Sequence, residues 1–192
     1  MQNRLPDWGD DELRSSIESI LLVAGGPVTV QALAAALGIS RAHATQVLAD
    51  VCARSKGGIR VQLHDGSAQL VTAPENIEVI HRYLGTSKPP ALSRSALETL
   101  TIVAYRQPVT RPEIEAIRGV NSDRAVHTLV ARGLIEERGS RETLGRPTEF
   151  GTTFAFLEYF GFVSLDDLPP LPGDTSGEAE QIDIGLRPAP TG

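Results

Sequence analysis

The sequence is poor in cysteine, methionine and aromatic residues: it has one Cys, one Met and one Trp among 192 residues, and aromatics make up 5%. The single thiol, Cys52, cannot close an internal disulfide or supply a zinc cluster, so we interpret it as a small core residue. No apolar run approaches the roughly 18 residues of a membrane-spanning helix, and no apolar segment follows a basic start. We therefore expect no secretory signal and no membrane association, and a cytoplasmic location.

Basic residues are also scarce, with 18 Lys and Arg against 24 Asp and Glu and a formal net charge of −6. Much of the acidity lies near the two ends of the chain, and the middle is close to neutral. No clustered Lys/Arg stripe of the kind that binds phosphates by counterion release is present in the sequence. The composition predicts weak or absent direct contact with DNA.

Catalytic motifs are missing as well. The sequence contains neither a GxxxxGK[ST] phosphate loop nor a GxSxG nucleophile elbow. Its four histidines do not have metal-ligand spacing with one another or with carboxylates; they are His43, His64, His81 and His127. We predict that the protein is not an enzyme and needs no cofactor or metal.

The chain does contain an internal repeat. Residues 17–48 align with residues 97–129, with one extra residue before the proline of the second copy. The tripeptide Pro-Val-Thr occurs at the same place in both copies, at 27–29 and at 108–110. Two copies of one small structural unit are predicted.

Each copy has the start and stop signals of three helices. In the first copy, apolar residues recur at helical spacing up to a Gly-Gly-Pro break, Thr29 and Ser40 are suited to cap two further helices, and Gly38 supplies the turn between them. In the second copy, Thr110 and Glu113 form a capping box, and Asn121 is expected to cap the third helix. A short helix, a glycine turn and a longer helix are typical of the helix-turn-helix motif.

A β-hairpin is predicted after each third helix, which makes each unit a winged helix. In the first hairpin, apolar and polar residues alternate on both sides of Asp65-Gly66, and a second, longer hairpin leads into Phe150. The predicted fold class is mainly α with small β wings (α+β), as two tandem winged-helix domains at 11–85 and 92–165. A helix over about 75–84 closes the first domain, and Pro89-Pro90 marks the joint. The acidic, Pro- and Gly-rich tail at 170–192 is expected to be disordered.

The stretch GRPTEFGTTFAFLEYFG at 145–161 is dense in aromatic residues. Gly145, Arg146 and Pro147 are expected at the tip and return of the second wing, and Thr152 or Thr153 is suited to cap a final helix that ends at Gly161. The rings could simply close the core of a small domain, which would account for Phe154 and Leu157 and leave Phe156, Tyr159, Phe160 and Phe162 as a surplus. Their number exceeds what one side of a short helix buries, which favours a partner groove as well.

Residues 92–172 resemble the segregation and condensation protein B family, above all in the stretches LETLTIVAYRQPVTRPEIEAIRGV, GRPTEFGTT and FGFVSLDDLP. Nearer the start of the chain, the stretch ESILLVAGGPVTVQALAAALG is similar to the family's N-terminal half. The resemblance implies a homodimeric, non-enzymatic subunit that binds a kleisin, segregation and condensation protein A, and through it the ATPase of an SMC (structural maintenance of chromosomes) complex. That complex acts in chromosome condensation and segregation during cell division, in the cytoplasm at the nucleoid.

In this family the C-terminal winged helices hold the kleisin and the N-terminal ones carry much of the dimer contact. Our candidate kleisin-binding residues are Arg146, Phe154, Phe156, Tyr159, Phe160 and Phe162, and our candidate dimerisation residues are Leu5, Trp8, Leu13 and Ile17. The competing interpretation is a DNA-binding transcriptional regulator. Its groove-reading residues would be Arg41, His43 and Gln46 in the first copy, or Arg124 and His127 in the second.

Overall fold

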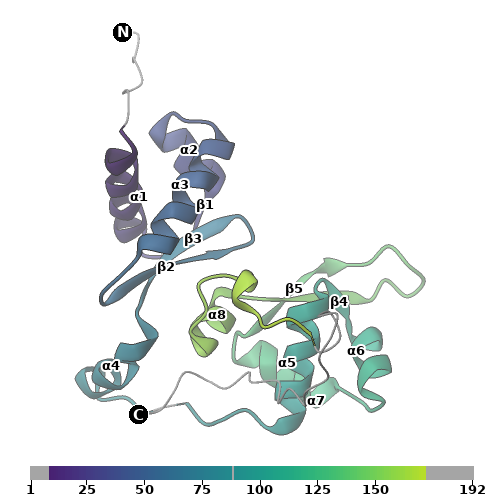
Figure 1. Ribbon diagram of the computed structural model, residues 1–192. Coiled ribbons are helices and arrows are strands. Elements are labelled where there is room, and N and C mark those ends of the chain that lie inside the picture. The colour runs from purple at the N-terminus through teal and green to yellow at the C-terminus, as the bar shows by residue number, and fades with distance from the viewer. Residues whose placement is uncertain (1–8, 88, 172–192) are drawn as a thin grey trace, which may run out of the picture. The chain divides into compact units, whose positions relative to one another are not determined.

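A computed structural model describes residues 9–87 and 89–171 and divides the chain into two compact units (Figure 1). Of the described residues, the first unit holds 9–80 together with a later segment, Gly161–Asp167. The second unit holds the described residues of 81–160 together with residues 168–171. The predicted range 92–165 thus contains a segment that packs on the first unit.

The first unit has three helices followed by a hairpin. Its elements are α1 (Asp10–Ala24), β1 (Val28–Thr29), α2 (Val30–Leu37), α3 (Arg41–Arg54), β2 (Ile59–His64), β3 (Ser67–Thr72) and the 3-10 turn η1 (Pro74–Asn76). Helix α4 (Ile77–Leu84) begins in this unit and continues into the second. The sheet is antiparallel in the order β1-β3-β2. The predicted caps are confirmed, because Thr29 accepts a hydrogen bond from the Ala32 amide and Ser40 from the His43 amide.

The wing of the first unit turns at the predicted dipeptide. Asp65 and Gly66 both have positive φ, 46° and 66°, and His64 pairs with Ser67 across the turn. Two consecutive left-handed residues make a tight hairpin whose twist matches that of the strands, and Asp-Gly adopts this conformation readily. The hairpin prediction is confirmed.

The core of the first unit is formed by one face of each helix and the inner face of the wing. Helix α1 contributes Leu13, Ile17 and Leu21 at i, i+4 spacing, and these side chains are almost fully buried. They pack against apolar residues of α2, α3 and the sheet, among them Leu33, Leu37, Ala44, Leu48, Val51, Val61 and Ala68. This regular burial on α1 explains why the periodic pattern predicts the helix.

The second unit repeats the order of the first. It contains α5 (Arg94–Arg106), β4 (Val109–Thr110), α6 (Arg111–Arg118), α7 (Asp123–Ala131), β5 (Ile135–Ser140), β6 (Thr148–Thr152) and α8 (Phe154–Phe160), with the sheet order β4-β6-β5. The second short turn, η2 (Leu165–Asp167), belongs to the first unit. Figure 1 shows the same succession of three helices and a hairpin in both units, as the repeat predicts.

The helix caps observed in the second unit are those predicted from the sequence, except at one helix. Ser93 accepts the Ala96 amide, and the Glu113 carboxylate accepts the backbone N–H of Thr110 at 2.8 Å. The prediction that Asn121 is the N-cap of α7 is wrong, because Ser122 occupies that position. Asn121 lies one residue earlier and accepts the Asp123 amide at 3.1 Å, so its side chain still supports the start of the helix.

Candidate partner-binding site

Helix α8 carries the aromatic residues that the sequence singles out. Its first turn is held by Thr153, whose Oγ1 accepts the Phe156 amide, and it ends at Phe160, directly before Gly161, which has a φ of 74°. Phe156 and Phe160 are buried, and their rings meet edge to face with centroids 5.1 Å apart. This geometry is favourable for aromatic pairs, so these two rings anchor α8 in the core of the second unit.

Two other rings of α8 remain accessible. Phe154 and Tyr159 are half-buried, and the Tyr159 ring meets Phe160 edge to face at 5.0 Å between centroids. Tyr159 is therefore held in place by a buried neighbour while part of its surface faces outward. A preorganised, partly exposed aromatic ring is the kind of residue that dominates binding energy at protein interfaces.

The loop of the second wing is held at its start by Arg141, which directly follows β5. This guanidinium donates to Glu149 Oε1 at 2.7 Å and to the carbonyl of Pro108 at 3.0 Å, and it forms an ion pair with Glu113. Hydrogen bonds from the backbone and hydroxyl of Thr110, followed by that from Arg141, hold the pKa of Glu113 below its ordinary value. The wing is thereby attached to the start of α6.

The tip of this wing presents one apolar and one charged side chain. Leu144 is completely exposed, and Arg146 is exposed with a φ of 40°, which is uncommon for a residue other than glycine. The predicted turn at Gly145 and Arg146 is confirmed. Sequence reasoning overlooked Leu144, although one leucine in a polar loop is a signal that could have identified it.

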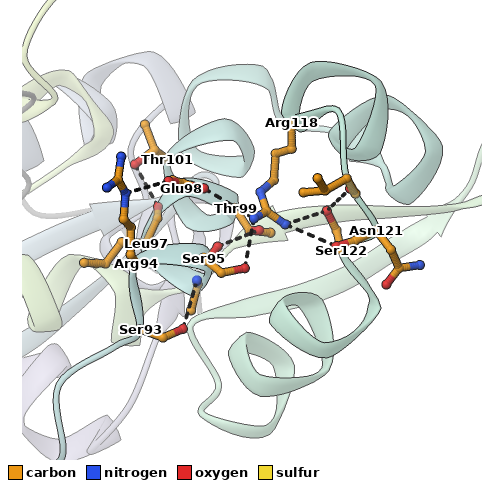
Figure 2. A network of polar contacts seen from close by, with 12 residues as sticks. Ser93, Arg94, Ser95, Leu97, Glu98, Thr99, Thr101, Arg118, Asn121 and Ser122 are labelled. Carbon is orange, nitrogen blue, oxygen red and sulfur yellow. Dashed lines mark hydrogen bonds and ion pairs between the residues drawn. The ribbon is translucent and has the colours of Figure 1, made fainter.

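A polar network joins the first three helices of the second unit (Figure 2). The side chain of Arg118, at the end of α6, is only 7% exposed and donates to Ser95 on α5 at 2.9 Å, to Ser122 at 3.0 Å and to Glu98 at 3.3 Å. Arg94 binds the other oxygen of Glu98 at 3.1 Å. Hydrogen bonds from Arg94 and then Arg118 hold the pKa of Glu98 below its ordinary value, so the network is charged at neutral pH.

The structure places the candidate kleisin-binding residues in four different settings. Phe156 and Phe160 are in the core, Phe154 and Tyr159 are accessible on α8, and Arg146 is at the wing tip. Phe162 is half-buried and belongs to the segment that packs on the first unit, where its carbonyl accepts a hydrogen bond from Gln62. The role of all six residues in binding a partner stays a prediction.

The candidate dimerisation residues are also divided. Leu13 and Ile17 are fully buried in the core of the first unit, whereas Leu5 and Trp8 lie outside the described residues, as does the tail from residue 172. The large apolar side chains that α1 exposes are Leu22 and Val23, at 69% and 87%. The run Leu21-Leu22-Val23 was the missed signal, since one helix face cannot bury three consecutive residues.

The residues of the DNA-binding interpretation are exposed, but several neighbouring basic groups are already engaged. On α3, Arg41, His43 and Gln46 are exposed, and on α7, Arg124 and His127 are exposed. However, Arg118 is occupied by the polar network, and Arg111 forms an ion pair with Asp123 at the start of α7. Of the arginines at this helix-turn-helix, Arg124 on α7 is exposed, whereas the two on the preceding helix α6 are engaged, which reduces the positive charge available to phosphates.

Neither a metal site nor a membrane segment was found in the part of the chain that the structure describes. Its His, Cys, Asp and Glu side chains form no group of three or more suited to a metal ion. None of the helices described is sufficiently long and apolar to cross a bilayer.

Two units, each with a helix-turn-helix and a β-hairpin wing, define a tandem winged-helix protein. Residues 15–171 match the family model described as segregation and condensation complex subunit ScpB. The chain belongs to this ScpB family.

Individual relatives have similar length and sequence. Segregation and condensation protein B of Moorella thermoacetica is 43% identical over 186 residues, which cover 95% of each chain. The solved ScpB of Mycobacterium tuberculosis is 36% identical, with a TM-score of 0.40, over 82% of this chain and 99% of that one. A solved dimer of an ScpB N-terminal domain with an ScpA peptide is 24% identical, with a TM-score of 0.34, over 36% of this chain and 91% of that one.

Proposed function

We propose that this chain is a non-enzymatic subunit of a bacterial SMC–kleisin complex, which binds the kleisin ScpA as a homodimer and acts in chromosome condensation and segregation. Membership of the ScpB family over residues 15–171 carries this proposal. The kleisin connects the protein to the SMC ATPase, so the protein is associated with the nucleoid in the cytoplasm. Direct contact with DNA is weak or absent, in keeping with the engaged arginines of the second unit.

The second unit binds the kleisin through the accessible side of α8, with Phe154 and Tyr159 as contact residues. The buried rings of Phe156 and Phe160 support them from the core, so little side-chain freedom is lost on binding. At the wing tip, Leu144 adds an apolar contact and Arg146 a positive charge. A kleisin segment that forms an amphipathic helix, apolar on one face and acidic beside it, has the matching chemistry.

The first unit forms the homodimer through the exposed end of α1. Leu22 and Val23 project from this helix away from the core residues Leu13, Ile17 and Leu21. Burying two large apolar side chains in a symmetric contact is favourable, and a two-fold axis lets the same surface serve both copies. Leu5 and Trp8, which precede α1 in the sequence, are proposed to extend this contact.

The experiment is a titration of the purified chain with the kleisin from the same genome, followed by light scattering behind size exclusion and by calorimetry. Replacing Tyr159 by Ala is expected to raise the Kd for kleisin about tenfold or more, as for an interface anchor. The matched control is Tyr83→Ala, which removes an 88% exposed tyrosine from α4 and should leave the Kd unchanged. A wild-type chain that fails to form a complex with kleisin would contradict the proposal, and equal effects of both variants would contradict the assignment to α8.

A further inference from the structure

The outer edge of strand β2 in the first unit is occupied by a segment from much later in the chain. In the sheet order β1-β3-β2, strand β2 pairs only with β3, which leaves one edge for another partner. The backbone N–H of Leu63 on this edge donates to the carbonyl of Val163 at 2.8 Å. Main-chain bonds of this kind are how an extended peptide adds to a sheet edge.

A second hydrogen bond to the same segment comes from a buried side chain. The amide nitrogen of Gln62 donates to the carbonyl of Phe162 at 2.7 Å, and the Gln62 side-chain oxygen accepts from the amide nitrogen of Gln69 at 3.2 Å. Gln62 is 2% exposed and Gln69 8%. Burying a glutamine side chain without hydrogen-bond partners is unfavourable. Here Gln69 orients Gln62, and Gln62 donates to a backbone carbonyl of the later segment, which indicates a specific binding site for that segment.

The bound segment is folded so that it fits this edge. Asp167 accepts the backbone N–H groups of Val163 at 2.6 Å and Ser164 at 3.2 Å, which closes the turn that contains η2. Beside it, Cys52 of α3 donates through its thiol to the carbonyl of Val61 on β2 at 3.4 Å. Burial first, and then the negative charge of Asp167, raises the pKa of Cys52 to about 11. Because the thiol is bound to the strand that carries the docking edge and is affected by the charge of Asp167, its reaction rate is expected to report whether the segment is in place.

We propose that Gly161–Asp167 is a strap that binds in cis to a peptide-docking edge of the first winged-helix unit, with Gln62 and the Leu63 amide as the recognition groups. The strap covers an edge that would otherwise be free to pair with other chains. It also makes the first winged-helix unit depend on residues that follow the second one in sequence. This proposal does not rest on the proposed function, because neither kleisin binding nor dimerisation is assigned to this edge.

The test uses the full-length chain and two readouts, hydrogen exchange at the Leu63 amide and the reaction rate of Cys52, its single thiol, with an aromatic disulfide reagent. Gln62→Met keeps the side-chain length and removes the donor. Losing one buried hydrogen bond shifts an opening equilibrium by roughly tenfold, so both rates are expected to rise about tenfold. The control Gln46→Met, at an exposed position on α3, should change neither rate.

A second variant separates release of the strap from damage to the sheet. Asp167→Asn alters only the strap and weakens the turn at Val163 and Ser164, so exchange at Leu63 should also rise while amides of α2 stay protected. Unchanged Leu63 exchange in both folded variants would overturn the proposal. Rates that depend on protein concentration would overturn the assignment in cis, because they would place the strap of a second copy on this edge.

Discussion

At the scale of single residues, Glu113 connects two parts of the second winged helix. Its carboxylate accepts both the N–H and the O–H of Thr110 at 2.8 Å, which caps α6, and it pairs with Arg141 at the start of the wing loop. The sequence predicts the capping box, because Thr and Glu three residues apart form it locally. The bond to Arg141 spans 28 residues and depends on the folded wing.

The lowered pKa of Glu113 gives a prediction for stability against pH. A carboxylate whose pKa is lower in the folded state stabilises the fold fully above its unfolded pKa, ordinarily 4.5, and this contribution is lost as the pH falls through the folded value. Glu113→Gln should therefore lower the unfolding free energy by about 0.5–1 kcal/mol at pH 7, a modest value because solvent screens the group. The difference should shrink below about pH 4.

Urea denaturation at several pH values measures this difference. The control is Glu142→Gln, at an exposed position on the same wing, which should have little effect. If the difference in unfolding free energy between the wild type and Glu113→Gln stays constant down to acid pH, the carboxylate does not supply the stabilisation.

At the scale of elements, α8 has separate inward and outward faces. Phe156, Leu157 and Phe160 are buried, while Phe154 and Tyr159 stay accessible. The sequence predicts the helix from its cap and its terminal glycine, but its assignment of Phe154 to the core and of Phe156 and Phe160 to the surplus is wrong, because Phe156 and Phe160 are buried and Phe154 is half-buried. In a helix of seven residues with four aromatic rings, several rotations bury an apolar surface of similar size, and the neighbouring helices decide among them.

We expect the two faces to respond differently to truncation. Phe156→Ala removes a fully buried ring and should destabilise the second unit by about 3–5 kcal/mol, because the transfer free energy is lost and a cavity remains. Phe154→Ala, at a half-buried position, should cost about 1 kcal/mol or less and should instead weaken kleisin binding. Thermal denaturation of both variants measures the contrast, and equal losses of stability would contradict the assignment of faces.

At the scale of the whole molecule, two copies of a small unit each build their own core, and α1 of the first unit has apolar side chains left over. Leu13 and Ile17 are fully buried in the core, whereas Leu22 and Val23 are largely exposed. Exposed apolar pairs on a helix are typical of surfaces that bind another protein.

Replacing Val23 by Asp should dissociate the proposed dimer, because two carboxylates would be brought close together at an apolar, symmetric contact. Light scattering at micromolar concentration is expected to give the monomer mass, with an unchanged circular dichroism spectrum. The matched control is Ile117→Asp, at a 57% exposed position in the second unit, which should leave the dimer intact. A Val23→Asp variant that stays dimeric would exclude α1 from the interface.

The sequence by itself determined the repeat, the order of elements, the Asp-Gly turn and most helix caps. All of these depend on residues within a few positions of each other, whose backbone conformations and hydrogen bonds are local. Only the tertiary structure decided which of the rings on α8 are buried, where Arg118 and Arg141 find their partners, and that Phe162 binds Gln62 across 100 residues. Such contacts depend on chain segments that meet only after folding, because burial and long-range pairing are properties of the packed molecule.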